Sequence, residues 1–333
     1  MLRIGILGAG SVVELYHLPV LRNLHGASIV WLCDKDETRA RRLQSMCRGA
    51  RAYSRIEDCP AVDVVLVAIP IGYRRDPLRH IFRSGWHALC EKPFAVTLAE
   101  HDALIAEAAE HGVQIGVGLM RRYYGNTITA RRLIASGAFG TVEEVWAAEG
   151  TRMLATGREE GWYQGDPRAA GGGVLMETGS HLVDQVFRIL DVSGFTWPHC
   201  QQTVFKDIDL ETRATSDLET PGAHPIKFTL AVSRLNDLGS GVRVKLSNAT
   251  LKIGVLPDAP LVVHGADGMP LGRIEGDSGA SHVYQAFYLE WEDFLAQCTI
   301  GRASAVSAET ARQGTAFIEG CYRSAIPSNG RST

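Results

Sequence analysis

The sequence lacks a long hydrophobic run and a strong excess of either charge. Its longest apolar run, Val64–Ile71, is far shorter than the roughly 20 residues that a membrane-spanning helix needs. The 34 Lys and Arg residues nearly balance the 37 Asp and Glu residues, and the formal net charge is −3. Scattered basic residues give no electrostatic footprint for nucleic acid. The sequence therefore disfavours membrane and nucleic-acid partners.

Cysteine pairs with metal-site or redox spacing are also lacking. The seven cysteines form an odd set without a C-x-x-C pair. We therefore expect neither a disulfide framework nor a structural zinc site. The chain begins directly with the pattern of a buried strand, which leaves no room for a secretory signal. On these grounds we expect a cytoplasmic protein.

Two domains are predicted from the length and from the hydrophobic pattern. The 333 residues suit two domains of about 150 residues each. Short apolar runs alternate with helical stretches in the first third, which is typical of strands buried on both faces of a parallel sheet. We expect the first domain to end at Leu119, the second to cover 120–326, and a polar tail at 327–333. The strands expected in the first domain are Leu2–Leu7, Ser28–Cys33, Val62–Ile69, His87–Cys90 and Val113–Gly118, and its clearest helix is Ala99–His111.

The pattern changes in the second domain. Longer alternating stretches between Thr203 and Ile274, broken by turn dipeptides, predict an open and mainly antiparallel sheet. The predicted fold class is therefore α/β, with an N-terminal doubly wound Rossmann sheet and a C-terminal α+β domain. We expect the last helix to be able to pack back on the first domain. The other elements expected here are a helix at 126–136, a strand at Val142–Gly150, a glycine junction at Gly171–Gly173, a helix with an apolar stripe from Val283 to Cys298, and a helix from Ser307 to about Ala325.

A glycine turn after the first strand predicts a dinucleotide site. Gly8 can make the tight turn out of the strand, and Gly10 lets a pyrophosphate approach the backbone N–H groups of the next helix, where Ser11 and Val12 follow. Val13 stands where the fingerprint has its third glycine. The alternative is a strand-to-helix turn that binds nothing.

Asp34, at the end of the second strand, favours NAD over NADP. Its carboxylate can accept hydrogen bonds from both ribose hydroxyls of NAD and would repel a 2′-phosphate. Arg39, Arg41 and Arg42 follow closely, so NADP remains possible. The predicted cofactor-binding residues are Gly8, Gly10, Ser11, Val12, Asp34, Ile69, Pro70, Glu91 and Lys92.

Lys92 is a candidate acid or base. The triplet Glu91-Lys92-Pro93 follows a predicted strand, so Lys92 should emerge at the carboxyl end of the parallel sheet, where open α/β folds bind ligands. A lysine there can donate to a substrate oxygen, and a nearby positive nicotinamide can lower its pKa into a working range. The alternative is an ordinary exposed lysine.

Glu177 and His181 form a second candidate pair after the triple glycine. They are four residues apart, so in a helix both side chains project from one face. Imidazole is the usual proton carrier near neutral pH, and a neighbouring carboxylate fixes its tautomer. The alternative is a helix start capped by Thr178 or Ser180, with His181 packed or solvated. No third ligand is positioned beside the pair, so we predict no metal.

In order and spacing these motifs resemble the glucose-fructose oxidoreductase, inositol dehydrogenase and MocA family. The resemblance covers residues 1 to about 190 and continues loosely to the last helices. The stretches that carry it are the glycine turn with Tyr16-His17-Leu18-Pro19, Val64–Pro70, Glu91-Lys92-Pro93, Arg121-Arg122-Tyr123, Trp162 with Asp166-Pro167, and the triple glycine with its Glu-x-x-x-His segment.

The resemblance implies hydride transfer between NAD(P) and a secondary alcohol or ketone of a sugar, cyclitol or related small polyol. By position, Lys92 and His181 match the catalytic lysine and histidine of the family, while Glu177 stands where an aspartate is usual. One extra methylene either changes the substrate hydroxyl that the carboxylate reaches or leaves it to orient His181. The resemblance also implies a homodimer or homotetramer through the open C-terminal sheet. The substrate-lining residues that it implies are Tyr16, His17, Arg122, Trp162 and Tyr163.

Two other functions are compatible with these motifs. One is an NAD-dependent glycosidase, which oxidises a sugar hydroxyl transiently and regenerates its cofactor, so that no net NADH appears. The other is a dinucleotide-binding sensor without catalysis. The joint presence of Lys92 and His181 speaks against a sensor, because a binding protein has no use for paired acid and base groups. Reduction of an imine is also compatible with the resemblance.

Overall fold

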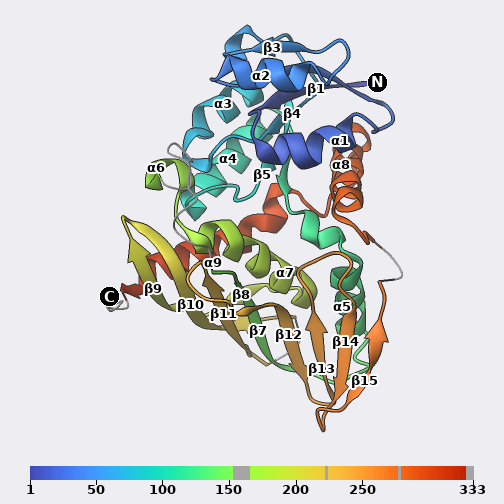
Figure 1. Ribbon diagram of the computed structural model, residues 1–333, viewed down its shortest axis with the longest axis vertical. Coiled ribbons are helices and arrows are strands. Elements are labelled where there is room, and N and C mark those ends of the chain that lie inside the picture. The colour runs from blue at the N-terminus through green and yellow to red at the C-terminus, as the bar shows by residue number, and fades with distance from the viewer. Residues whose placement is uncertain (153–165, 222–223, 277–278, 328–333) are drawn as a thin grey trace. The chain divides into compact units, whose positions relative to one another are not determined.

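Two units of the chain are distinguished by their internal contacts in the computed structural model, which describes residues 1–152, 166–221, 224–276 and 279–327 (Figure 1). Unit 1 comprises Met1–Met120 and Val283–Arg312. Unit 2 comprises Arg121–His282 and Gln313–Thr333. The sequence assigns all of 120–326 to the second domain, whereas the contacts group Val283–Arg312 with the first.

A six-stranded parallel sheet forms the centre of unit 1. Its order is β3-β2-β1-β4-β5-β6, so the chain winds outward in both directions from the β1/β4 pair. The predicted doubly wound sheet is confirmed, and the short edge strand β3 is an addition that the sequence did not indicate. The strands are β1 Leu2–Leu7, β2 Ala27–Cys33, β3 Arg51–Tyr53, β4 Val64–Val67, β5 His87–Glu91 and β6 Ile115–Gly118.

The central strands are apolar because both of their faces are covered. All four residues of β4 are fully buried, as expected of an inner parallel strand. Gly5 interrupts the apolar pattern of β1 because the ring of Trp31 occupies the space beside it. A Cβ on Gly5 would lie 2.1 Å from that ring. The indole Nε1 of Trp31 donates to the carbonyl oxygen of Pro60 at 2.9 Å, which satisfies this buried polar group.

Capping and apolar stripes explain the longer helices of unit 1. The Thr97 hydroxyl accepts from the N–H of Glu100 at 3.1 Å, and the Glu100 carboxylate accepts from the N–H of Val96, so α4 begins with a capping box. The stripe predicted for α8 buries Phe287 and Trp291, and α8 contacts η1 and α1. The helical elements are η1 Val13–His17, α1 Leu18–Leu21, α2 Glu37–Gln44, η2 Ile56–Asp58, η3 Ile71–Tyr73, α3 Arg75–Arg83, α4 Leu98–Glu110 and α8 Val283–Ile300.

A ten-stranded, mainly antiparallel sheet forms unit 2. Its order is β15-β14-β13-β12-β7-β11-β10-β9-β16, and β8 pairs with β10. The expected open sheet is confirmed, with two parallel pairs, β7 with β11 and β9 with β16. The strands are β7 Val142–Gly150, β8 Gly194–Phe195, β9 His199–Phe205, β10 Ile208–Glu219, β11 Ile226–Ser233, β12 Gly239–Leu246, β13 Ala249–Ile253, β14 Leu261–Gly265, β15 Pro270–Ile274 and β16 Ala325–Pro327.

Two helices cover one face of this sheet. Helix α7 (Ser180–Leu190) contacts β7 and β12, and α5 (Gly125–Ala135) contacts β13 and β14 (Figure 1). Strand β10 alternates buried and exposed residues over 212–219, as expected of a sheet with one covered face. The remaining elements are η4 Met120–Tyr123, α6 Pro167–Ala170, η7 Leu175–Gly179 and α9 Ala308–Ser324. Among the residues that the structure describes, none of the helices is long and apolar enough to cross a bilayer.

We predict that Gly173→Ala destabilises the protein. A Cβ at Gly173 would lie 2.0 Å from the backbone oxygen of Asp209, so the backbone must shift, at a cost of about 1–3 kcal/mol. Gly314, inside α9, is the matched control, because its Cβ position is open among the described residues. Gly314→Ala should raise the free energy of unfolding by about 0.5–1 kcal/mol. Urea denaturation measures both changes, and a Gly173→Ala protein as stable as the wild type contradicts the prediction.

Candidate functional site

The glycine turn after β1 is shaped by close backbone contacts. Gly8 has φ +102°, and a Cβ on it would lie 2.5 Å from the carbonyl oxygen of Ala68 at the end of β4. Only glycine fits this position. At Gly10, in contrast, no heavy atom of the described residues beyond its chain neighbours lies within 4 Å of a Cβ position. The Gly10 carbonyl accepts from the N–H of Glu14 at 3.1 Å and starts the next helix. This open space at a helix N-terminus fits a diphosphate.

Asp34 links the end of β2 to the glycine turn. Its Oδ2 accepts from the N–H of Ala9 at 2.7 Å, and its Oδ1 accepts from the N–H of Asp36 at 2.9 Å. The carboxylate is therefore held in one orientation. Each carboxylate oxygen has a second acceptor site, so the two ribose hydroxyls of a dinucleotide still find acceptors.

The three arginines that follow Asp34 are all paired with carboxylates. The pairs lie at the surface, where each contributes little to stability. Their arrangement nevertheless means that a 2′-phosphate would compete with a carboxylate for each guanidinium. The pairs are Arg39 with Asp36 at 3.4 Å, Arg41 with Glu37 at 2.8 Å, and Arg42 Nη2 with Glu14 Oε2 at 2.7 Å.

Lys92 directly follows β5 and is half-buried. Since β1 and β5 are parallel strands of one sheet, Lys92 and the glycine turn lie along the same carboxyl edge. Arg74, which the sequence did not single out, holds this segment in place. Its Nε donates to the carbonyl oxygen of Ile69 at 2.7 Å, and its Nη1 donates to the carbonyls of Glu91 and Pro93, on either side of Lys92.

Glu91 is a buried carboxylate bound to His17. The Nε2 of His17 lies 2.8 Å from Glu91 Oε1, and Glu91 Oε2 accepts from the backbone N–H of Lys92 at 3.1 Å. Burial alone would raise the pKa of Glu91, but the hydrogen bond with His17 and the charges of Lys92 and Arg74 hold it below the usual value. Glu91 therefore stays ionised inside unit 1.

His17 lies deeper than a substrate-lining residue would. Its side chain is 0% exposed, and its Nδ1 accepts from the indole Nε1 of Trp291 at 3.0 Å. Both ring nitrogens are thus engaged within unit 1. Tyr16, the other residue expected near a substrate from this segment, is half-buried, and its ring stacks on Phe287 with 5.3 Å between the centroids.

Asp209 anchors the glycine junction in unit 2. Its carboxylate, 2% exposed, accepts from the backbone N–H of Gly173 at 2.7 Å and of Leu175 at 2.8 Å. It also accepts from the hydroxyls of Tyr322 at 2.7 Å and Thr212 at 2.9 Å. Burial and the Asp209 charge raise the pKa of Tyr322 well above its usual value, so this hydroxyl stays a donor. The start of the helix that carries Glu177 is therefore fixed by a residue that the sequence did not indicate.

Glu177 lies in a π-helical turn, and His181 follows in the first turn of α7. The segment is helical, which is the condition that the i, i+4 argument needs, but the wider π turn changes the angular spacing that the argument assumes. Glu177 Oε2 forms an ion pair with Nη2 of Arg234, which directly follows β11 and is 5% exposed. A lone arginine after an alternating strand has no local signature, so sequence reasoning missed it. His181 is half-buried.

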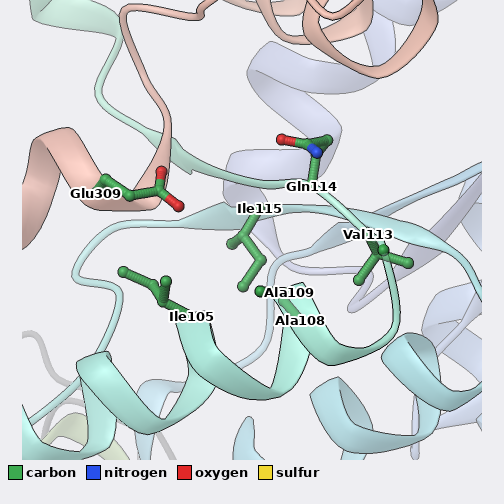
Figure 2. A pocket seen from close by; sticks show the side chains of 8 residues that line it. Ile105, Ala108, Ala109, Val113, Gln114, Ile115 and Glu309 are labelled. Atoms are coloured by element: carbon green, nitrogen blue, oxygen red, sulfur yellow. The ribbon is translucent and has the colours of Figure 1, made fainter.

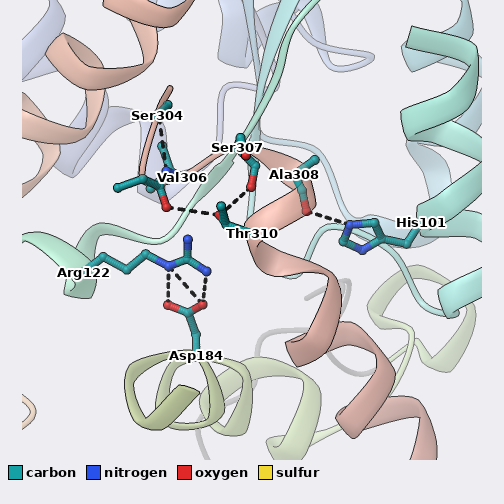
Figure 3. A network of polar contacts seen from close by, with 9 residues as sticks. His101, Arg122, Asp184, Ser304, Val306, Ser307, Ala308 and Thr310 are labelled. Carbon is teal, nitrogen blue, oxygen red and sulfur yellow. Dashed lines mark hydrogen bonds and ion pairs between the residues drawn. The ribbon is translucent and has the colours of Figure 1, made fainter. Parts of the chain in front are cut away.

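Arg122 has a buried carboxylate partner in unit 2. Its guanidinium is bidentate on Asp184 of α7, with Nε 2.9 Å from Oδ2, as Figure 3 shows. The same figure shows, within unit 1, the hydrogen bond from His101 Nε2 to the carbonyl of Ala308 at 2.9 Å. Trp162 and Tyr163, also expected to line a substrate site, lie outside the described residues.

A pocket of about 290 Å³ lies in unit 1, and Figure 2 shows side chains that line it. It includes Val113–Ile115, at the amino end of β6, which is the sheet edge opposite to Lys92. Among the described residues no group of three or more His, Cys, Asp and Glu side chains could hold a metal ion. The pocket is lined by Ile105, Ala108, Ala109, Gly112, Val113, Gln114, Ile115 and Glu309.

Two family models match most of this chain. The model described as the oxidoreductase family with an NAD-binding Rossmann fold matches residues 2–119. The GFO/IDH/MocA C-terminal domain model matches residues 127–268. The two matches follow one another along the chain and belong to one family.

Curated relatives match part of the chain. An inositol 2-dehydrogenase of Corynebacterium glutamicum is 33% identical over 144 residues, which is 42% of each chain. The NADP(+)-dependent scyllo-inositol 2-dehydrogenase of Bacillus subtilis is 26% identical over 188 residues, 56% of this chain and 51% of the relative. An uncharacterised oxidoreductase of Schizosaccharomyces pombe is 29% identical over 191 residues, 55% of this chain and 50% of the relative. The chain thus spans about half the length of the curated relatives it matches.

Solved structures share the fold over nearly the whole chain. An oxidoreductase domain protein from Kribbella flavida superposes with a TM-score of 0.84 at 20% identity, covering 97% of this chain and 96% of the other. A 3-ketoreductase from Actinomadura kijaniata, solved in complex with NADP, has a TM-score of 0.82 at 16% identity, covering 98% of each chain. At these identities the likeness establishes the fold.

We predict that substitutions of Arg122 and Asp184 have non-additive effects on the free energy of unfolding. Arg122→Met leaves a buried carboxylate without its partner, so it should lower the free energy of unfolding by about 3–5 kcal/mol. Adding Asp184→Leu should recover most of the loss. The exposed pair of Arg131 and Asp191, 3.5 Å apart, is the control, and Arg131→Met should cost less than about 1 kcal/mol. Urea denaturation of both single variants and the double variant measures the coupling, and additive losses would contradict it.

Proposed function

This chain belongs to the GFO/IDH/MocA family of oxidoreductases, and from that premise we propose that it transfers a hydride between a nicotinamide cofactor and a secondary alcohol or ketone. We propose a sugar, cyclitol or related small polyol as the substrate class, since inositol dehydrogenases are among its relatives. The observation that carries the proposal is the shared carboxyl edge of the parallel sheet, where the glycine turn and Lys92 both lie.

The residues around the glycine turn fit a dinucleotide. Gly8 makes the turn, the open space at Gly10 admits the diphosphate, and the backbone of Ser11 and Val12 supplies N–H groups at the helix start. Asp34 would accept from the adenosine ribose. Ile69 and Pro70 follow β4, next to β1 in the sheet, and would complete the cofactor site with Glu91 and Lys92.

NAD is the preferred cofactor in this proposal. The backbone N–H groups of Ala9 and Asp36 hold the Asp34 carboxylate in one orientation. From the end of β2 it would accept ribose hydroxyls and repel a 2′-phosphate. The nearby arginines are already paired with carboxylates, so none stands ready to bind a 2′-phosphate without breaking an ion pair. Both observations point in the same direction, although NADP serves one named relative.

Lys92 and His181 share the proton chemistry of the proposed reaction. The nicotinamide, when bound, accepts or supplies the hydride. In the oxidative direction Lys92 or His181 takes the hydroxyl proton, and the O–H electrons form the second C–O bond as the hydride leaves the carbon. The other group donates a hydrogen bond to the developing alkoxide. The reductive direction returns the same proton to the oxygen.

Glu177 is proposed to orient His181. Its Oε2 is engaged by Arg234, and this ion pair limits the rotation of the side chain. A carboxylate held in this way can fix the tautomer of a neighbouring imidazole. The alternative role is a direct contact between the Glu177 carboxylate and a substrate hydroxyl.

We also propose a homodimer or homotetramer through the face of the unit 2 sheet that α5 and α7 do not cover. Exposed positions alternate along β10, and the Arg243 guanidinium lies 4.0 Å from the ring centroid of Trp146 on the neighbouring strands. A sheet face with exposed side chains across several strands can pair with a second copy of the chain.

We predict tighter binding of NADH than of NADPH by the wild type. Asp34→Ala should narrow the gap, because it removes ribose hydrogen bonds and the repulsion of a 2′-phosphate. Asp58→Ala, at an exposed position of η2, is the control and should leave the gap unchanged. Fluorescence titration of the three proteins with NADH and with NADPH gives the six affinities. A wild type that binds NADPH about tenfold more tightly, a difference of about 1.4 kcal/mol, would show that Asp34 does not select the cofactor.

We predict that Lys92→Ala and His181→Gln each lower kcat by about 10² to 10⁴, the usual contribution of a positioned acid or base. The affinity for NADH should stay nearly intact. His111→Gln, at the exposed end of α4, is the control for the histidine change. Turnover is read at the nicotinamide absorbance with a panel of sugars, cyclitols and their keto forms. Full activity of Lys92→Ala, or cleavage of a glycoside without net NADH, contradicts the proposal.

A further inference from the structure

We propose that His17, Glu91 and Trp291 form a buried positioning network for Lys92, in which the indole of Trp291 selects the tautomer of His17. The network lies entirely in unit 1. The inference rests on the proposed function, because that function makes the placement of Lys92 matter for catalysis. None of the three side chains needs to touch the substrate.

The hydrogen-bond partners define the tautomer of His17. An indole N–H can only donate, so the Nδ1 that lies 3.0 Å from Trp291 Nε1 must be the unprotonated, accepting nitrogen. The ring proton is therefore on Nε2, which faces Glu91 Oε1 at 2.8 Å and donates to it. Trp291 thus decides which nitrogen of His17 points a proton at Glu91.

Glu91 transmits this constraint to the backbone of Lys92. Its second oxygen accepts from the Lys92 N–H at 3.1 Å, so one carboxylate joins His17 to the residue proposed as acid or base. Gly118, paired with Glu91 across β5 and β6, makes room for the carboxylate. A Cβ there would lie 3.2 Å from the carboxyl carbon, tighter than ordinary contact. Arg74 donates hydrogen bonds to the carbonyl groups of Glu91 and Pro93, on both sides of Lys92. The backbone around Lys92 is therefore constrained by both Glu91 and Arg74.

Aromatic packing prevents His17 from turning away. The ring of Phe287 meets it edge to face with 4.8 Å between the centroids, and Trp291 does the same at 6.0 Å. His17 and Trp291 are both 0% exposed, so water cannot replace a lost partner without opening the core. The two residues are 274 positions apart in the chain, and α8 brings the indole to the histidine.

Loss of the Trp291 indole donor should make the backbone at Lys92 more mobile. In Trp291→Phe the Nδ1 of His17 has no donor, so the ring can change tautomer and stop donating to Glu91. The Glu91 carboxylate can then turn, and the Lys92 N–H loses its fixed acceptor. Displacement of a reacting group by about 1 Å is enough to slow a reaction by about 10²-fold, so even a partial shift should be measurable.

The experiment compares Trp291→Phe with Trp31→Phe. Trp31 is a matched control, because it is also 0% exposed in unit 1 and its Nε1 also donates one hydrogen bond, to Pro60. Hydrogen exchange at the Lys92 amide reads the positioning without any substrate. Steady-state kinetics give kcat and KM, and titration gives the affinity for NADH. The expected result for Trp291→Phe is amide exchange at least about tenfold faster and kcat about tenfold lower, with NADH affinity unchanged.

The outcomes of this experiment test the positioning network and the proposed function separately. Trp31→Phe should leave both the Lys92 exchange rate and kcat within about twofold of the wild type. If Trp291→Phe behaves like Trp31→Phe in either measurement, the positioning network is refuted. A wild type without nicotinamide-dependent turnover refutes the proposed function instead, since exchange at Lys92 is read independently of turnover.

A measurement on the wild type tests the network even if the Trp291→Phe variant does not fold. Nitrogen-15 NMR of the histidine rings distinguishes the protonated from the unprotonated ring nitrogen. The network requires His17 to carry its proton on Nε2. A spectrum with the His17 proton on Nδ1 overturns the inference without any substitution.

Discussion

A buried carboxylate must be surrounded by hydrogen-bond donors, and this requirement shapes both units around the candidate catalytic side chains. In unit 1 Glu91 takes a donor from His17 and another from the backbone of Lys92. In unit 2 Asp209 takes two backbone N–H groups from the glycine junction that precedes Glu177. In each case the carboxylate forms hydrogen bonds with the backbone of a segment at or next to a candidate catalytic side chain.

Glycine is required where these carboxylates approach the backbone. A Cβ at position 118 would press on the Glu91 carboxyl group, and one at position 173 would overlap the Asp209 backbone. The triple glycine therefore has a structural cause in unit 2 that is separate from any contact with a ligand. Gly8 follows the same logic against Ala68, whereas the space at Gly10 is open and suits a diphosphate. Steric demand thus separates the glycines that close contacts require, at positions 8, 118 and 173, from Gly10, which we propose admits the diphosphate.

Near the glycine turn of unit 1, the Asp34 carboxylate has a fixed orientation, and the arginines that follow it form ion pairs with carboxylates. Each carboxylate oxygen of Asp34 accepts one hydrogen bond from a backbone N–H group. The second acceptor site of each oxygen can accept from a hydroxyl group. The arginines beside it are held by Asp36, Glu37 and Glu14. A dinucleotide without a 2′-phosphate meets this surface with no ion pair to break.

The sequence by itself determined the parallel sheet, the open second sheet, the glycine turn and the place of Lys92 at a strand end, because hydrophobic period and turn residues are local signals. The i, i+4 spacing of Glu177 and His181 places both on one face only if the segment is helical, and the structure shows a π turn at Glu177. Only the tertiary structure decided the partners: Arg234 for Glu177, Trp291 for His17, and Tyr322 for Asp209. Periodicity encodes which residues are buried, whereas the identity of a buried partner depends on which distant elements pack together. For the same reason His17, whose motif suggested a substrate contact, is found inside unit 1 beside a helix from the far end of the chain.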